Sequence, residues 1–225
     1  MNHTILDFDS LASAYDAWFD GEGKLIFAIE VKAFQEMLPL LPKPWLEVGV
    51  GSGRFAQALG IETGLDPSIN LLAMAKRRGV TGFLARGEEQ FFDKETFGTV
   101  FLIVTLCFVD SPLAVLKESY RILKPGGKTV LGLVLRETPW GQYYQRKKQE
   151  EHRFYKHATF YSYQEIAEFL EHTGFAIEKV MSTLFQRPKE LKELESPQEG
   201  FSTDAGFIVI VAHKTPAERR ADKGG

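Results

Sequence analysis

The sequence predicts a single α/β domain with a mostly parallel, doubly wound sheet of seven strands, helices on both faces and an antiparallel terminal strand pair. Two observations support this prediction. From residue 45 onward, short apolar runs alternate with segments of helical periodicity, which is the pattern of consecutive βαβ units. The chain has 225 residues, of which 44 % are hydrophobic and 25 % are charged, and this suits one domain with a sizeable core. We expect the domain to span residues 1–213 and residues 214–225 to form a flexible tail.

Ahead of the first strand, the sequence predicts a helical cap over residues 1–40. Apolar residues recur at helical spacing over 8–19 and again over 26–38, and a glycine-containing turn at 20–23 separates the two segments. The strands of the parallel part are expected at the five apolar runs 45–48, 61–65, 82–85, 99–105 and 129–134.

Helix ends are also marked in the sequence. The Ser-Pro pair at 111–112 offers an N-cap followed by proline at the first helical position, and the Pro-Gly-Gly run at 125–127 is expected to break that helix before the next strand. Ser162 and Glu165 have the spacing of a capping box, and Gly174 is placed to end the helix they begin. The last two strands are expected at 175–183 and 206–212, paired antiparallel.

Charge and cysteine content narrow the class of protein. The formal net charge is -3 and the isoelectric point about 6.0, so no global positive field would draw the chain to nucleic acid or anionic membranes. No apolar stretch approaches the roughly 20 residues that cross a bilayer. The single cysteine, Cys107, sits in an apolar run and cannot form an internal disulfide. We therefore expect a cytoplasmic protein without a membrane partner.

The candidate ligand site begins at the first strand. Gly49, Gly51 and Gly53 follow a buried strand and precede a short helical pattern, where glycines let the backbone turn sharply and approach a ligand closely. A dinucleotide fingerprint starting at Gly49 would need a third glycine at position 54, which is Arg54. The spacing therefore favours a nucleotide other than NAD and makes an NAD-dependent oxidoreductase the weaker alternative.

The second strand ends in Asp66, nineteen residues after Glu47. A carboxylate at this position can accept two hydrogen bonds from the vicinal hydroxyls of a ribose. The alternative is that Asp66 caps the helix that begins near Ser68, and the two roles can coexist.

The glycine motif, with an acidic residue two positions before Gly49, resembles the first motif of class I S-adenosylmethionine-dependent methyltransferases. The resemblance covers residues 15–134 and is strongest to the small-molecule branch that includes quinone-biosynthesis enzymes. It implies a Rossmann-like sheet, S-adenosylmethionine as the cofactor and S-adenosylhomocysteine as the product. The family pattern is broken at Arg86, where an acidic residue is frequent. The cofactor-binding residues that the resemblance implies are Tyr15, Glu47, Gly49, Gly51, Gly53, Asp66, Pro67, Gly87, Glu88, Thr105 and Leu106.

Methyl transfer from a sulfonium needs alignment of donor and acceptor more than a catalytic base. If the acceptor is an amine or a phenol, a proton must leave, and five residues are candidates to assist or to line the acceptor site. They are Tyr143, Tyr144, Tyr155, His152 and His157. The five histidines show no tight metal-ligand spacing and no second soft ligand accompanies Cys107, so we expect no metal.

Residues 136–161 are the expected acceptor lid. The segment holds seven aromatic residues in 26, against 12 % aromatic residues in the chain, and it leaves the fifth strand on the side where ligands bind in open α/β sheets. We also expect Tyr15 and Trp18 to close over the cofactor; the alternative is that they only anchor their helix on the core.

Two further alternatives stay open. The basic residues 146–148, with Arg153 and Lys156, admit a tRNA or other RNA substrate, although Glu150 and Glu151 interrupt the charge. The chain could also be a non-catalytic module that binds S-adenosylmethionine without an acceptor. The favoured function is a methyltransferase acting on a nitrogen, oxygen or carbon atom of a small molecule.

Overall fold

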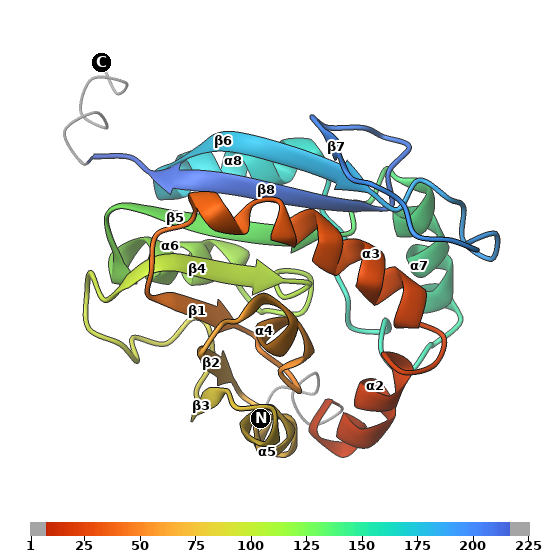
Figure 1. Ribbon diagram of the computed structural model, residues 1–225, viewed down its shortest axis with the longest axis horizontal. Helices are drawn as coiled ribbons and strands as arrows, with labels where there is room; N and C mark the ends of the chain where they lie inside the picture. Colours follow the sequence, from red (N-terminus) through yellow and green to blue (C-terminus); the bar gives the residue numbers. More distant parts are fainter. Residues whose placement is uncertain (1–7, 217–225) are drawn as a thin grey trace.

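The computed structural model describes residues 8–216, which form one central sheet with helices on both faces (Figure 1). The strands are β1 (Trp45–Val48), β2 (Thr63–Asp66), β3 (Thr81–Leu84), β4 (Phe97–Ile103), β5 (Leu123–Leu133), β6 (Phe175–Thr183), β7 (Gln198–Glu199) and β8 (Phe207–Lys214). The helices are α2 (Ala12–Trp18), α3 (Lys24–Gln35), the short 3-10 helix η1 (Leu38–Leu40), α4 (Arg54–Leu59), α5 (Ile69–Arg77), α6 (Pro112–Ile122), α7 (Pro139–Gln149) and α8 (Tyr163–Thr173).

The strand order is β3-β2-β1-β4-β5-β8-β6-β7. The first five strands in this order run parallel, β8 is antiparallel to β5, and β6 is antiparallel to β8. The predicted fold, a mostly parallel sheet with an antiparallel terminal pair, is confirmed. An eighth strand, β7, has only two residues and pairs with the end of β6, and two exposed polar residues carry no periodicity that could have predicted it.

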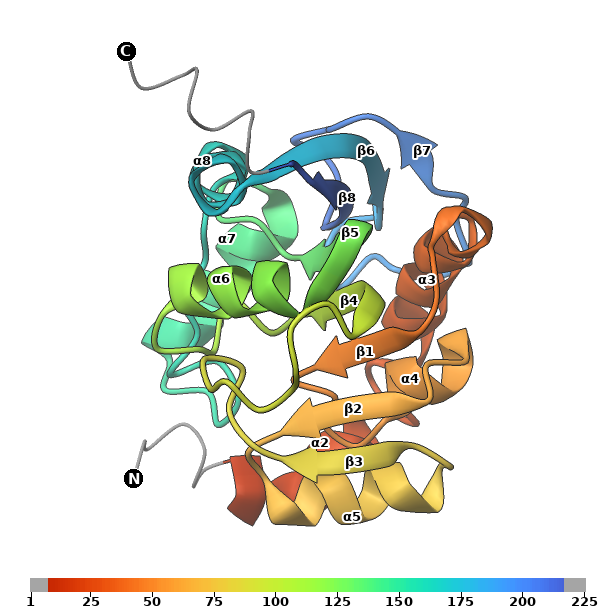
Figure 2. The ribbon, with the colours of Figure 1, turned by 90° about the vertical axis from the view of Figure 1, so that its left-hand side faces the viewer.

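Alternate residues of the central strands face two separate cores. On one face, Phe101 of β4 packs with Phe34 of α3 and Phe55 of α4, and on the other, Leu102 packs with Leu116 of α6 and Leu170 of α8. Figure 2 shows α6 and α8 on one side of the sheet and α3 and α4 on the other. Both faces are therefore covered, which explains why the strands read as continuous apolar runs.

Three of the predicted helix ends are confirmed, at Ser111, at Ser162 and at Gly174. The Ser111 hydroxyl accepts a hydrogen bond from Ala114 N at 3.2 Å. Ser162 and Glu165 form both bonds of the capping box, and Gly174 ends α8 at φ 93°. The local signals were sufficient here because each bond joins residues three positions apart in the chain.

The Pro-Gly-Gly run at 125–127 differs from the expectation. Phe97 of β4 pairs with Leu123 and Thr99 pairs with Lys128, so the residues between are an outward bulge within β5 and not a separate turn before it. The chain can bulge there because Gly126 adopts φ 73°.

Lys214 and Thr215, which were expected in the tail, are bonded to the domain. Lys214 is the last residue of β8, and its Nζ donates to Leu123 O at 2.6 Å. The Thr215 hydroxyl donates to Gly174 O at 2.7 Å. Residues 217–225 of the expected tail lie outside the described residues. Over residues 8–216, the helices are all too short or too polar to span a membrane.

The segment 136–161, between β5 and α8, contains α7 and returns to its starting point. Arg136 N donates to Tyr161 O at 2.9 Å, which ties the two ends together. The Thr138 hydroxyl caps α7 by accepting from Gly141 N at 3.1 Å. A β-carbon on Gly141 would overlap the Leu135 carbonyl oxygen, so α7 lies directly against the end of β5.

We predict that Gly141→Ala destabilises the protein by roughly 1–3 kcal/mol, because the backbone of α7 must move away from Leu135. Urea denaturation followed by circular dichroism measures this difference. Gln142→Ala is the matched control, since Gln142 is the next residue and is exposed; it should change stability by less than about 0.5 kcal/mol. Equal stabilities of the two variants would contradict the tight packing.

Candidate functional site

The turn between β1 and α4 is built by three glycines with positive φ. Gly49, Gly51 and Gly53 adopt φ values of 75°, 52° and 80°. A β-carbon on Gly49 would lie 2.6 Å from the Thr105 side chain, and one on Gly53 would lie 2.9 Å from Ala75 of α5. The glycines therefore allow the loop after β4 and helix α5 to approach the turn closely.

Asp66, at the end of β2, holds this turn in place. Its Oδ2 accepts a hydrogen bond from Gly51 N at 2.8 Å, and its Oδ1 accepts one from Ser68 N at 2.9 Å. Burial raises the pKa of Asp66 to about 6, although these hydrogen bonds oppose the shift. The cap of α5 is the Ser68 hydroxyl, which accepts from Leu71 N at 3.2 Å. Asp66 thus organises the turn, and Ser68 supplies the cap.

A pocket opens where β1, β2 and β4 end, and we call it the glycine-turn pocket. It is lined by Phe8, Tyr15, Gly49, Gly51, Asp66, Pro67, Ser68, Leu71, Ile103, Val104, Thr105, Phe108 and Val109. Six of the residues that the sequence implicated lie together in this lining: Tyr15, Gly49, Gly51, Asp66, Pro67 and Thr105.

The other five implicated residues lie outside the lining. Glu47 and Leu106 are buried, with exposed fractions of 2 % and 0 %. Gly53 lies against α5, and a β-carbon on Gly87 would lie 2.8 Å from Val48. The Glu88 carboxylate accepts from Asp110 N at 3.1 Å. These five positions therefore do not line the pocket.

The sequence missed several apolar residues of the lining, such as Ile103, Val104 and Phe108. They lie at or just after the end of β4, where an apolar run is as typical of the hydrophobic core as of a pocket wall. Val104 adopts φ 52°, which is rare for a β-branched residue, and its N–H donates to Gly132 O at 2.9 Å. No sequence pattern marks this conformation.

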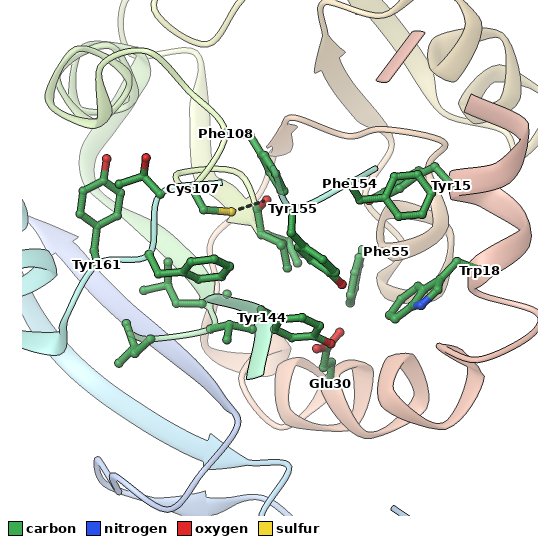
Figure 3. Close-up of a pocket in the computed structure, with 18 of the residues that line it drawn as sticks. Tyr15, Trp18, Glu30, Phe55, Cys107, Phe108, Tyr144, Phe154, Tyr155 and Tyr161 are labelled. Carbon is green, nitrogen blue, oxygen red and sulfur yellow. Dashed lines mark hydrogen bonds between the residues drawn. The ribbon is translucent and has the colours of Figure 1, made fainter. Parts of the chain in front are cut away.

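A second, more apolar space adjoins the first, and we call it the apolar chamber (Figure 3). Its volume is about 970 Å³ when the part open to solvent is counted. It is lined by Phe8, Tyr15, Trp18, Phe19, Glu30, Phe55, Ile103, Val104, Cys107, Phe108, Gly132, Leu133, Val134, Leu135, Tyr144, Phe154, Tyr155, Thr159, Phe160 and Tyr161. Both spaces are lined by Phe8, Tyr15, Ile103, Val104 and Phe108, so they adjoin along this shared wall.

Four of the candidate acceptor residues lie around two neighbouring spaces. Tyr144 and Tyr155 line the apolar chamber and also a wider outer pocket, which includes Trp18 and Lys147 as well. Tyr143 and His152 line the outer pocket but not the chamber. His157 belongs to neither lining.

Burial raises the pKa of Tyr15, Tyr144 and Tyr155 above that of an ordinary phenol, and it raises the pKa of the Cys107 thiol to about 12. These groups stay protonated at neutral pH. Burial lowers the pKa of His152, whose ring stacks on Tyr155 with 5.0 Å between centroids. The chamber can thus hold an apolar body and exclude water, while the hydroxyls act as hydrogen-bonding groups.

Helix α2 is fastened across the glycine turn by charged side chains. Arg54 Nε pairs with Asp16 Oδ1 at 2.9 Å, and Arg54 Nη2 pairs with Asp20 Oδ2 at 2.5 Å. Arg78 joins Asp16 Oδ2 at 2.8 Å and donates to Ser52 O at 2.8 Å. Burial alone would raise the pKa of Asp16, but the bonds from Arg54 and Arg78 hold it well below its usual range. A dinucleotide fingerprint would have glycine at position 54, and glycine has no side chain that could bind Asp16 and Asp20 as Arg54 does.

The fastening places Tyr15 over the glycine turn. A β-carbon on Gly51 would lie 3.6 Å from the Tyr15 ring. The ring also packs edge-on against Phe19 and Phe154, at centroid distances of 5.4 and 5.8 Å. Trp18 lines the apolar chamber but not the glycine-turn pocket. In the described residues, three or more histidine, cysteine or carboxylate side chains nowhere gather in a way that could hold a metal ion.

Comparisons with known proteins agree with this geometry. A family model described as a methyltransferase domain matches residues 27–180. Uncharacterised proteins of Mycobacterium tuberculosis and Methanocaldococcus jannaschii are 39 % and 36 % identical to this chain. The first match covers 94 % of this chain and 75 % of the relative, and the second covers 92 % and 98 %.

Solved structures give the same result. A crystal structure from Thermotoga maritima, described as a SAM-dependent methyltransferase and possible histamine N-methyltransferase, is 36 % identical, with a TM-score of 0.87 over 95 % of this chain and 100 % of that one. Geranyl diphosphate C-methyltransferase from Streptomyces coelicolor, solved with Mg²⁺, geranyl diphosphate and S-adenosyl-L-homocysteine, shares the fold at 16 % identity, with a TM-score of 0.58 over 81 % and 79 %. The chain therefore belongs to the class I methyltransferases and is an enzyme whose methyl donor is S-adenosylmethionine.

Proposed function

We propose that this enzyme methylates a small molecule held in the apolar chamber, with the methyl donor in the glycine-turn pocket. One observation carries the proposal: the two spaces share the wall formed by Tyr15, Val104 and Phe108. A donor and an acceptor bound there would meet along this wall, as in-line displacement requires.

The residues of the glycine-turn pocket fit S-adenosylmethionine. Asp66 uses one lone pair of each carboxylate oxygen for Gly51 and Ser68, which leaves further lone pairs for two ribose hydroxyls. Gly49 and Gly51 expose backbone without side chains, and the Tyr15 ring covers the turn. When bound, the cofactor supplies a methyl group already activated by a sulfonium. The chain's own residues bind and orient the two ligands and exclude water from the space between them.

The acceptor is held by the segment 136–161 in this proposal. The segment contributes Tyr144, Phe154, Tyr155, Thr159, Phe160 and Tyr161 to the apolar chamber. Thr159 N donates to Cys107 O at 2.8 Å, which joins the segment to the loop after β4. These contacts support the interpretation of 136–161 as an acceptor-binding lid.

The basic residues of α7 favour a small molecule over RNA. Lys147 pairs with Glu150 at 3.0 Å, and Lys148 Nζ donates to Ala158 O at 2.6 Å. Both cations therefore have partners within the lid. The Thermotoga protein is described as a possible histamine N-methyltransferase, and histamine is an amine. The Streptomyces enzyme is named for geranyl diphosphate, which is an anion. The two neighbours therefore point to small acceptors of opposite charge.

The proposal is tested by measuring S-adenosylhomocysteine release from S-adenosylmethionine with panels of small amines, phenols and carboxylic acids. Turnover with at least one small molecule is expected. Binding of the cofactor without turnover on any panel would instead support a non-catalytic binding module, and turnover on tRNA alone would assign the RNA alternative.

We predict that Asp66→Ala weakens S-adenosylhomocysteine binding by roughly 1.5–3 kcal/mol, because charge-assisted hydrogen bonds to the ribose are lost. In the wild type, affinity should fall as the pH drops through about 6, where the Asp66 carboxylate becomes protonated. Asp66→Asn should remove this pH dependence. Calorimetry measures both effects, with the exposed Asp93→Asn as the matched control. Unchanged affinity in a folded Asp66→Ala protein would refute the role.

We predict that α2 opens and closes over the cofactor. S-adenosylhomocysteine should slow proteolysis within the first 23 residues, and Arg54→Met should accelerate it, because Asp16 and Asp20 lose their shared partner. Arg77→Met, an exposed cation at the end of α5, is the control and should behave like the wild type. Equal cleavage with and without the ligand would indicate that Tyr15 and Trp18 only anchor the helix.

We predict that Tyr155→Ala raises the KM of the best acceptor about tenfold or more, because a buried ring of the chamber is removed. The affinity for S-adenosylhomocysteine should stay within a factor of ~3. Tyr143→Ala changes the outer pocket and should have a smaller effect. Loss of cofactor affinity with unchanged acceptor kinetics would assign the segment to the wrong ligand. Salt-sensitive tRNA binding abolished by Lys147→Ala would replace the lid interpretation.

A further inference from the structure

Glu30 is an acidic residue inside the apolar chamber. It lies on α3, on the helix face that also carries Ile26, Ile29 and Phe34 into the core. Its exposed fraction is 6 %, and Figure 3 shows its carboxylate near the Tyr144 hydroxyl, on the same side of the chamber as Trp18. Nothing in the sequence singles out Glu30, because a lone glutamate within an amphipathic helix is typical of a solvated face.

Glu30 has no hydrogen bond and no ion pair with any other residue in the range 8–216. Burial alone raises its pKa to about 8, with no neighbouring cation to oppose the shift. A buried carboxyl without a partner costs stability in either protonation state. Such a cost is typical of a residue kept for a ligand.

Among residues 8–216, no cation lines the chamber. Glu30 is the one charged side chain in the lining as far as the structure describes it. The other titratable groups that face the chamber are Tyr15, Cys107, Tyr144, Tyr155 and Tyr161, and burial raises the pKa of each. They are neutral around pH 8, so Glu30 is the group of the lining that changes charge there.

Aromatic residues line the same chamber as this carboxylate. Figure 3 shows four aromatic side chains of the chamber lining together with Glu30: Trp18, Phe55, Tyr144 and Tyr155. The faces of aromatic rings attract cations, and a desolvated carboxylate attracts them more strongly. An anionic acceptor, by contrast, would meet a like charge and no donor cation.

We propose that the apolar chamber takes a small molecule that carries a protonated nitrogen, and that Glu30 is the counter-ion of that nitrogen. This inference rests on the proposed function, because it identifies the class of acceptor for the same chamber. Glu30 lines the chamber but not the glycine-turn pocket. The paired nitrogen is therefore an anchoring group, distinct from the atom that is methylated, and Glu30 binds and positions the acceptor.

Ion pairing at this site has a defined proton balance. Below the pKa of Glu30 the carboxyl is protonated, so binding of an ammonium converts it to the carboxylate and releases one proton to the buffer. The proton leaves the carboxyl oxygen and the ammonium keeps its own. Above that pKa, binding takes place without proton release.

The first experiment compares matched ligands on the wild-type enzyme saturated with S-adenosylhomocysteine. The probes are 2-phenylethylamine, 2-phenylethanol and phenylacetate, together with histamine, its alcohol analogue and imidazole acetate. By calorimetry at pH 8.5 we expect an amine to bind at least about tenfold more tightly than its alcohol, and the carboxylates to bind most weakly. An alcohol or an acid that binds as tightly as its amine, or no binding by either amine, would overturn the proposal.

The second experiment uses Glu30→Gln, which keeps the shape of the side chain, with Glu36→Gln just beyond the same helix as the exposed control. At pH 8.5, Glu30→Gln should weaken amine binding roughly 30-fold or more. Titrations at pH 6.5 in buffers of different ionisation enthalpy should give about one proton released by the wild type and by Glu36→Gln, and none by Glu30→Gln. Equal proton release by all three would overturn the proposal.

A stability measurement separates binding from a structural role. At pH 9, where Glu30 is ionised and unpaired in the free enzyme, Glu30→Gln should melt a few degrees above the wild type. A saturating amine should raise the midpoint of the wild type more than that of the variant. A variant that melts below the wild type at pH 9 would assign Glu30 to the fold. Failure of S-adenosylhomocysteine to bind the wild type would instead refute the proposed function itself.

Discussion

The functional site depends on the divergence of the chain after β1 and β4, two neighbouring parallel strands. The helix that follows β1 lies on one face of the sheet and the helix that follows β4 lies on the other (Figure 2). Such a reversal of direction leaves a crevice beyond the carboxyl ends of the strands. The glycine turn, Asp66 and the wall from Ile103 to Phe108 all open into this crevice, each from a different strand. The topology therefore gives the residues of the proposed donor and acceptor sites one common edge.

A crevice at the edge of a sheet must be covered, and the covering elements use two kinds of interaction. Helix α2 is held at the rim by the ion pairs of Arg54 and Arg78 with Asp16, whose side chains are each 18 % exposed. Partly exposed ion pairs contribute modestly to stability. The segment 136–161 is held inside by aromatic packing, for example Tyr144 on Tyr155 at 4.4 Å between ring centroids. Tyr15 of α2 also packs edge-on against Phe154 of this segment, so the two covering elements contact each other.

The sequence predicted those features that are decided within a few residues of the chain. The capping box of Ser162, the C-cap at Gly174 and the glycine turn before α4 are of this kind, and so is the sheet class. Residues whose role depends on tertiary packing were not predictable in the same way. Gly53 and Gly87 owe their identity to close neighbours. Tyr143 lines the outer pocket but not the chamber, whereas Tyr155 lines both the outer pocket and the chamber. The apolar residues at the end of β4 read as core because a pocket wall has the same composition.

Glu30 extends this argument from position to charge. The crevice is lined by two carboxylates, Glu30 and Asp66. Both have raised pKa values because burial disfavours their charged forms. Backbone N–H groups partly compensate Asp66, so its charge is stabilised before any ligand arrives. Glu30 lacks such donors, and the interaction that would compensate it must come from the ligand. A chamber of this kind selects ligands by the sign of their charge as well as by their shape. Aromatic faces can pack against ligands of many shapes, but an unpaired carboxylate is compensated only by a cation or a hydrogen-bond donor.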